Sequence, residues 1–132
     1  MITNFFKDLI ANAVFHADSS SIPETYYIGL SVTEPTEYGG NISEPKSTTG
    51  YKRVSLDGVF SPADIGVIKN KEQIRFSPAT SPQGVISHYC IFDNESGGNL
   101  CVYGSLSEAK QVGTQDILLF QAGDLEIQVV GQ

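Results

Sequence analysis

Apolar residues at the start of the chain repeat with the spacing of one face of an α-helix. They lie three and four positions apart and are Phe6, Leu9, Ile10, Ala13 and Val14. Thr3 or Asn4 is placed to cap this helix, because a side-chain oxygen there can accept a hydrogen bond from a free amide of the first turn. Residues 18–21 and then Pro23 oppose its continuation. The pattern predicts one amphipathic helix over about residues 4–16.

From residue 26 onward the pattern becomes that of β-strands. Residues 26–32 are rich in aromatic and β-branched side chains and are followed by Pro35, so they predict a strand. Further strands are expected at three shorter segments, residues 51–56, 66–68 and 74–76. Residues 34–50 contain prolines and glycines between polar positions, which predicts loops with at most one short edge strand. We expect this connection to be the most exposed part of the chain.

Two apolar runs between residues 85 and 106 flank a polar turn that contains Gly97 and Gly98. Glycines permit the positive φ of a tight reversal, so the segment predicts a β-hairpin. Its alternation predicts a register that pairs apolar side chains across the strands: Ile91 with Leu100, Tyr89 with Val102, and Val85 with Leu106. The same register places Cys90 opposite Cys101. Both faces of the hairpin carry apolar residues, so each face needs a cover.

A second hairpin is expected near the C-terminus. Its strands are residues 117–120 and 125–130, separated by the turn residues 121–124. Many short strands with regular turn signals and a single helix are typical of an all-β domain. We therefore predict a mainly β fold: a single antiparallel β-sandwich domain over residues 1–132, with one N-terminal α-helix and strands from about residue 26 to residue 130.

The charge balance narrows the classes of partner. Lys and Arg number 8 against 15 Asp and Glu, which leaves a formal net charge of −7. Binding to nucleic acid or to anionic lipid needs a basic surface, so neither is an expected partner. No apolar run approaches the about 20 residues of a membrane-spanning helix. The first residues also lack the pattern of a secretory signal, so we expect synthesis in a host cytoplasm.

Three residues of the first hairpin invite a chemical interpretation. His88, Cys90 and Cys101 could form part of a zinc site, or a thiol beside its base. A fourth ligand and the closely spaced Cys-x-x-Cys pairs of zinc sites are absent from the sequence. The alternatives are two packed thiols with a hydrogen-bonded histidine, or a cross-strand disulfide. We expect packed thiols, no metal and no cofactor.

The carboxylates do not form a recognisable catalytic set. Asp93 and Glu95 lack the alternating ligand spacing of an EF-hand loop and suit a turn. Glu34, Glu37 and Glu44 could be imagined as a glycosidase pair, but such a pair needs a fixed separation and one protonated acid. We interpret them as solvated loop charges. The sequence therefore predicts no catalytic residues and no enzyme activity.

A series of short motifs occurs in one order along nearly the whole chain. They are Tyr27-Ile28-Gly29-Leu30-Ser31, Thr33-Glu34-Pro35-Thr36, Gly39-Gly40-Asn41, Glu44-Pro45, Gly50-Tyr51-Lys52-Arg53-Val54, Ile74-Arg75-Phe76-Ser77-Pro78-Ala79-Thr80, Ile91-Phe92-Asp93, Gly97-Gly98-Asn99-Leu100, Gly104, and Phe120-Gln121-Ala122-Gly123-Asp124-Leu125. With these motifs the chain resembles a family of short tailed-phage virion proteins, commonly described as tail-fibre or minor structural proteins. The resemblance implies a β-rich structural module of a phage particle that is oligomeric and has no catalytic residues to carry over.

Two hypotheses from different classes follow. The first is a virion structural protein, associated with the tail, tail fibre or capsid, that contacts other virion proteins and copies of itself through strand edges, the N-terminal helix and residues 34–50. Its candidate assembly contacts are Phe5, Phe6, Leu9, Glu37, Tyr38 and Glu44. The second is a host-surface or carbohydrate-binding module of the particle, which needs solvent-facing tyrosines for stacking. The tyrosines available for it are Tyr26, Tyr38, Tyr51 and Tyr103.

Overall fold

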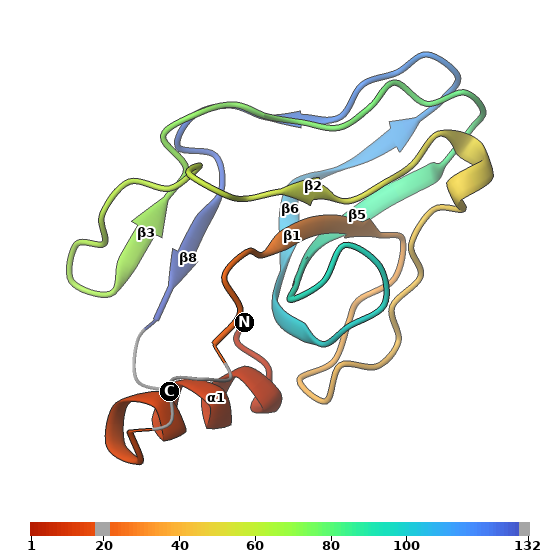
Figure 1. Cartoon of the computed structure of the whole chain (residues 1–132). Coiled ribbons are helices and arrows are strands. Elements are labelled where there is room, and N and C mark those ends of the chain that lie inside the picture. Colours follow the sequence, from red (N-terminus) through yellow and green to blue (C-terminus); the bar gives the residue numbers. More distant parts are fainter. Residues whose placement is uncertain (18–21, 130–132) are drawn as a thin grey trace.

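One α-helix, one short 3-10 helix and eight strands make up residues 1–17 and 22–129, the part of the computed structural model that is described here (Figure 1). In chain order they are α1 Asn4–Phe15, β1 Tyr27–Ser31, η1 Ser47–Thr49, β2 Val54–Ser55, β3 Val67–Lys69, β4 Ile74–Arg75, β5 Gly84–Phe92, β6 Leu100–Val112, β7 Leu119–Phe120 and β8 Glu126–Gln128. The prediction of a mainly β fold with an N-terminal helix is confirmed. Residues 18–21, expected to follow the helix, and residue 130, expected to end the last strand, lie outside the described residues.

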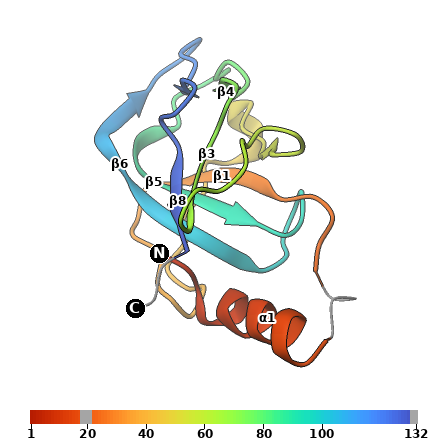
Figure 2. The ribbon, with the colours of Figure 1, turned by 90° about the vertical axis from the view of Figure 1, so that its left-hand side faces the viewer.

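The helix begins and ends close to its predicted limits. Thr3, rather than Asn4, supplies the cap, because its Oγ1 accepts a hydrogen bond from the amide of Phe6 at 3.3 Å. The same hydroxyl donates to the carbonyl of Leu100 at 2.6 Å and is buried. The cap therefore also fastens the start of α1 to β6. In Figures 1 and 2 the helix lies below the sheet.

The strands form one antiparallel sheet and two short ribbons. The sheet has the order β2-β1-β5-β6, while β3 pairs with β8 and β4 pairs with β7. The main hydrophobic core joins the sheet to these ribbons and contains, among others, Ile28, Ile86, Ile74 and Phe120. Among the described residues, the layer across the core from the sheet is thus two separate ribbons (Figure 2), so the mainly β class is confirmed while a continuous two-sheet sandwich is not seen.

The predicted hairpin of residues 117–120 with residues 125–130 is wrong, because the two strands do not pair with each other. β7 pairs with β4, with Ile74 opposite Phe120, and β8 pairs with β3 instead of with β7. The intervening turn is held by the buried side chain of Asn70. Its Oδ1 accepts from the amides of Gly123 at 3.1 Å and Leu125 at 2.9 Å, and its Nδ2 donates to the carbonyl of Gln121 at 2.9 Å. A partner more than fifty positions away therefore directs these two strands apart.

The β5–β6 hairpin is confirmed, but its expected register is wrong. The observed partners across the strands are Phe92 with Leu100, Ile91 with Val102, Cys90 with Tyr103, Tyr89 with Gly104 and Val85 with Gln111. Cys101 is an extra residue in a bulge, and its carbonyl accepts a hydrogen bond from the amide of Thr3 at 3.0 Å. The bulge moves Cys101 into the main core, whereas Cys90 lies in a separate cluster on the other face. The two thiols are free, so a cross-strand disulfide is not formed.

Both faces of this hairpin are covered, as the apolar pattern requires. The second cluster contains Cys90, Phe92, Leu100 and Tyr103, and Ile42 packs against it. Residues 34–50 therefore cover part of one face of the sheet through Ile42, in addition to connecting its strands. They contain the 3-10 helix η1 and no strand. The face opposite this cluster belongs to the main core.

Candidate assembly surface

A bidentate ion pair ties residues 34–50 to the sheet. Arg53 Nη2 donates to Glu44 Oε1 at 2.7 Å, and Arg53 Nε donates to Glu44 Oε2 at 3.0 Å. The hydroxyl of Tyr51 also donates to Glu44, while it accepts from the amide of Leu30 at 3.0 Å. The Arg53 side chain is only 7% exposed. The interpretation of Glu44 as a solvated loop charge is therefore wrong.

The same arginine holds the turn of the β5–β6 hairpin. Arg53 Nη1 donates to the carbonyls of Asn94 at 2.9 Å and Gly97 at 2.7 Å. Its guanidinium carbon lies 3.5 Å from the centre of the Phe92 ring, which adds a cation–π contact. A lysine could not make this set of bonds, because only the planar guanidinium has a fork of fixed donors. We call Gly29, Glu44, Tyr51, Arg53 and Phe92 the Arg53 cluster.

Glycine at position 29 makes room for the Arg53 cluster. A Cβ there would come within 2.5 Å of the Tyr51 hydroxyl oxygen and 2.9 Å of a Glu44 carboxylate oxygen. The members of this cluster come from separate motifs of the sequence, spread from residue 29 to residue 92. Four of the ten motifs that carry the family resemblance thus contribute to one structural centre, which holds a loop and a turn in place.

Burial raises the pKa of Tyr51 and of the two thiols. Burial, and then the hydrogen bond to Glu44, raise the pKa of Tyr51, so it stays a hydrogen-bond donor. Burial likewise raises the pKa of the Cys90 and Cys101 thiols to about 12. His88 Nδ1 lies 2.8 Å from the hydroxyl of Ser87. Thiols that remain protonated at neutral pH are poor nucleophiles and poor metal ligands.

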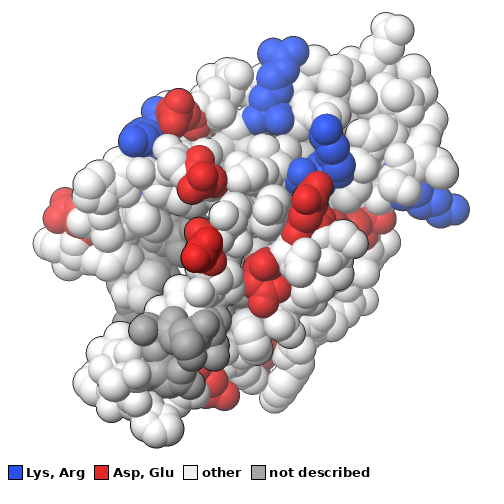
Figure 3. All heavy atoms as spheres, in the orientation of Figure 1, with Lys and Arg blue, Asp and Glu red and all other residues white. Residues whose placement is uncertain are grey.

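No group of three or more potential metal ligands comes together within residues 1–17 and 22–129. Within the same ranges, no helix has the length and apolar content needed to cross a membrane. The face drawn in Figure 3 carries acidic and basic side chains side by side, without a continuous basic area among the residues drawn in colour.

Three of the six candidate contacts point into the fold. Leu9 is buried, and the ring of the half-buried Phe6 meets Tyr26 edge to face at 5.9 Å. Glu44 belongs to the Arg53 cluster. The remaining three, Phe5, Glu37 and Tyr38, lie on two segments that meet, because the amide of Asn4 donates to the carbonyl of Glu37 at 2.9 Å. We call Phe5, Glu37 and Tyr38 the helix–turn surface.

A network of local hydrogen bonds fixes the turn that displays Tyr38. The amide of Gly39 donates to the carbonyl of Thr36 at 2.9 Å, and the amide of Thr36 donates to the carbonyl of Gly40 at 3.1 Å. The side chain of Asn41 donates to the carbonyl of Glu34 at 2.8 Å. Tyr38 is 82% exposed at the tip of this turn. A side chain on a fixed backbone binds at a lower entropic cost than one on a loose loop.

The structure exposes further apolar residues that the sequence pattern did not select. Phe15 is 89% exposed at the end of α1, and Ile65 is 92% exposed in the turn before β3. Phe15 lies outside the apolar stripe of the helix, and this position already indicates in the sequence that its ring faces away from the core. A groove of about 720 Å³ runs between α1 and β8, with Ile10 and Ile127 among its apolar walls. Phe15 and this groove place exposed apolar area beside the helix.

The four tyrosines proposed for stacking on a sugar do not form an exposed group. Tyr103 is buried, Tyr51 belongs to the Arg53 cluster, and Tyr26 packs on Phe6. Tyr38 is the exposed member of the four. Three of these four tyrosines are therefore engaged in contacts within the fold.

The fold and this surface are those of a β-rich structural protein whose buried polar groups hold its own loops. A family model described as "Podophage GP4 fiber I protein gp80" matches residues 1–128. The chain belongs to this family and is a phage fiber structural protein. The resemblance to short tailed-phage tail-fibre proteins is thereby confirmed. A search of curated proteins finds no match.

Proposed function

We propose that the chain is a tail-fibre subunit that works by assembly contacts with other virion proteins and with copies of itself, and that it catalyses no reaction. The observation that carries this proposal is the helix–turn surface, in which exposed Phe5 and Tyr38 are presented by a hydrogen-bonded backbone. The fiber family to which the chain belongs supports a site in the virion.

Aromatic side chains suit this role physically. A buried phenylalanine or tyrosine removes about 150–250 Å² from water, and tyrosine is enriched among the residues that dominate interface energies. Glu37 is half-buried beside Tyr38 and suits a polar rim. The backbone that carries this surface is held by contacts inside the fold. Phe6 and Leu9 fix the helix, and Glu44 fixes the 34–50 segment.

The proposal is tested in phage particles that carry Phe5→Ser or Tyr38→Ala. The copy number of the chain in purified virions is measured by quantitative mass spectrometry. We expect a loss of incorporation, with the melting temperature of the isolated variants close to that of the parent. Lys52→Ala is the matched control, because Lys52 is exposed and adjacent to the Arg53 cluster. Normal incorporation of both aromatic variants would contradict the assigned surface.

Self-association is tested by light scattering of the purified chain at two concentrations, with and without reductant. We expect a discrete multimer that survives dilution. Its mass should not respond to reductant, because Cys90 and Cys101 are both buried and free. A monomer at both concentrations would contradict the homo-oligomer, while the particle experiment would still decide the contacts with other virion proteins.

A further inference from the structure

β6 is an edge strand whose outer side is only partly covered. At its beginning, residues 1–3 lie along it: the amide of Thr3 donates to the carbonyl of Cys101 at 3.0 Å, and the amide of Tyr103 donates to the carbonyl of Met1 at 2.9 Å. From residue 104 to residue 111, no backbone hydrogen bond to another described residue occurs outside the ladder with β5. This stretch therefore presents an open strand edge.

A second irregularity weakens the ladder in the same stretch. Ile86 lies opposite Lys110 and His88 lies opposite Ser105, so the four residues 106–109 of β6 face Ser87 alone. Backbone donors and acceptors there have fewer partners within the chain than in a regular strand. Such groups pair with water in the isolated protein and are free to pair with an added strand.

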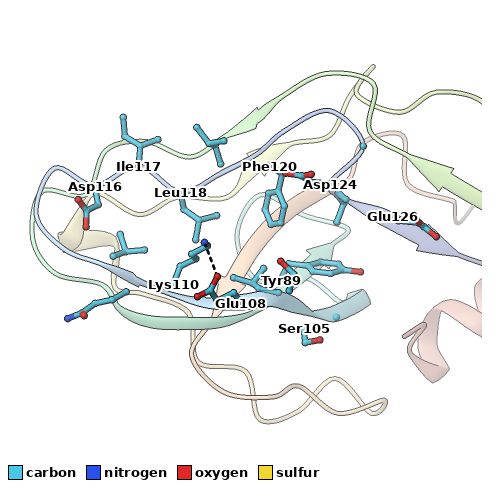
Figure 4. Close-up of a pocket in the computed structure, with 18 residues that line it drawn as sticks. Tyr89, Ser105, Glu108, Lys110, Asp116, Ile117, Leu118, Phe120, Asp124 and Glu126 are labelled. Carbon is cyan, nitrogen blue, oxygen red and sulfur yellow. Dashed lines mark ion pairs between the residues drawn. The ribbon is translucent and has the colours of Figure 1, made fainter.

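A groove of about 830 Å³ runs along this open edge (Figure 4). Its other wall is the segment around β7, a strand that pairs only with β4 among the described residues. Leu118 and Phe120 point from that wall toward β6, and the Phe120 ring meets Tyr89 edge to face at 6.4 Å. Leu118 and Phe120 belong to the main core and are 9% and 8% exposed, so the core forms the apolar floor of the groove and the open edge of β6 forms one side. Its volume lies within the about 300–1,000 Å³ that is usual for ligand sites.

The charges along the groove determine whether an acidic or a basic segment binds there. Its lining includes the carboxylates of Glu108, Asp116, Asp124 and Glu126 and the ammonium group of Lys110. Lys69, outside the lining, lies 3.7 Å from Glu126, so four carboxylates face two lysines and an excess of two negative charges remains. Lys110 and Glu108 approach only to 4.0 Å, and both are well exposed, so this pair neutralises little of the field. A second copy of this chain carries a net charge of −7 and is a poor electrostatic match. A segment with lysine or arginine side chains is a good one.

We propose that this groove binds an extended, Lys- or Arg-bearing segment of another virion protein, which adds as a strand to the open edge of β6. Alternate side chains of the segment face the floor around Leu118 and Phe120, and the basic ones between them reach the acidic rim. Main-chain hydrogen bonds to residues 105–111 supply the register. The inference rests on the proposed function, since the segment belongs to a neighbour in the particle.

The probe is a fluorescein-labelled, capped heptapeptide that alternates valine and lysine, with binding followed by fluorescence anisotropy. We expect saturable binding that weakens as salt is raised. Glu108→Lys should weaken it about tenfold, because two like charges then face each other at the rim. Glu108 is 82% exposed, so this variant is expected to fold. Glu95→Lys reverses an exposed charge on the β5–β6 turn, outside the groove lining, and should leave the affinity unchanged.

Two further measurements separate strand addition from simple charge attraction. Hydrogen exchange of the amides in residues 105–111 should slow when the peptide is bound. A peptide of equal charge with proline in place of valine should bind at least about tenfold more weakly, because it has fewer amide donors for the edge. Equal binding of the proline peptide, unchanged exchange, or equal effects of the two charge reversals would each overturn the proposal. None of these results depends on the particle experiment with Phe5 and Tyr38.

Discussion

The two ends of the β5–β6 hairpin show opposite uses of polar groups. At the turn end, Arg53 binds two turn carbonyls, a carboxylate and an aromatic face, so its guanidinium makes its contacts within the chain. At the far end, residues 106–109 bulge away from β5 and β6 leaves an edge open. One end has the features of a structural centre and the other those of a place for a partner. Unpaired backbone groups, more than charge alone, therefore mark where an added strand can bind.

Removing the arginine should have the largest effect on this comparison. Arg53→Ala leaves Glu44 without its ion-pair partner and frees the turn carbonyls, so we expect a loss of about 3–5 kcal/mol in the free energy of unfolding. Chemical denaturation measures it. Lys52→Ala, at the exposed neighbouring position, should change stability by less than about 0.5 kcal/mol. Similar losses in both variants would show that the Arg53 cluster is not a structural centre.

The two faces of α1 should respond differently to truncation. Leu9→Ala removes a buried side chain, and we expect a cost of about 2–4 kcal/mol. Phe5→Ala, on the exposed side, should cost less than about 1 kcal/mol while it reduces incorporation into particles. Thermal unfolding of the pair gives the comparison. A larger loss for Phe5→Ala would mean that the helix–turn surface is needed for folding and not only for assembly.

Alkaline pH should destabilise the fold through the buried thiols. Their pKa rises from 9.0 to about 12 on folding, so above pH 9 the unfolded chain releases protons that the native chain retains. The unfolded state then binds fewer protons, and stability falls as pH rises from 9 toward 12. Urea midpoints at pH 8, 9 and 10 should decrease in that order. The slope should be shallower in a Cys90→Ala, Cys101→Ala variant, and an unchanged slope would exclude the thiols as its source.

The smallest change in stability is expected at the tip of the 36–40 turn. Tyr38→Ala removes an exposed ring, so we expect a shift in unfolding free energy of less than about 0.5 kcal/mol. Tyr26→Ala is the matched comparison, because that ring packs against Phe6 and its loss should cost more. Thermal melts of both variants measure the difference. A marked loss of stability in Tyr38→Ala would move Tyr38 from the assembly surface to the fold.

Local patterns predicted the elements that depend on local physics. The spacing of Phe6 and Leu9 predicted α1, and the glycines at 97 and 98 predicted the β5–β6 turn, because periodicity and positive φ are properties of neighbouring residues. The expected register is already off by one residue at the turn, where Phe92 instead of Ile91 faces Leu100, and two bulges shift it further. The bulge at Cys101 is bonded by Thr3, which lies far along the chain. Glu44 was misread for the same reason, since its partner Arg53 lies across a loop.

Periodicity, composition and short motifs predict a mainly β chain with one N-terminal helix, an acidic net charge, and a series of motifs typical of phage tail-fibre proteins. What those motifs do depends on the fold. It joins Glu44, Tyr51 and Arg53 into one cluster, draws the last strands to separate partners through Asn70, and leaves part of β6 open. These contacts join side chains and backbone groups of segments that lie far apart in the chain, and no local pattern records which distant groups meet.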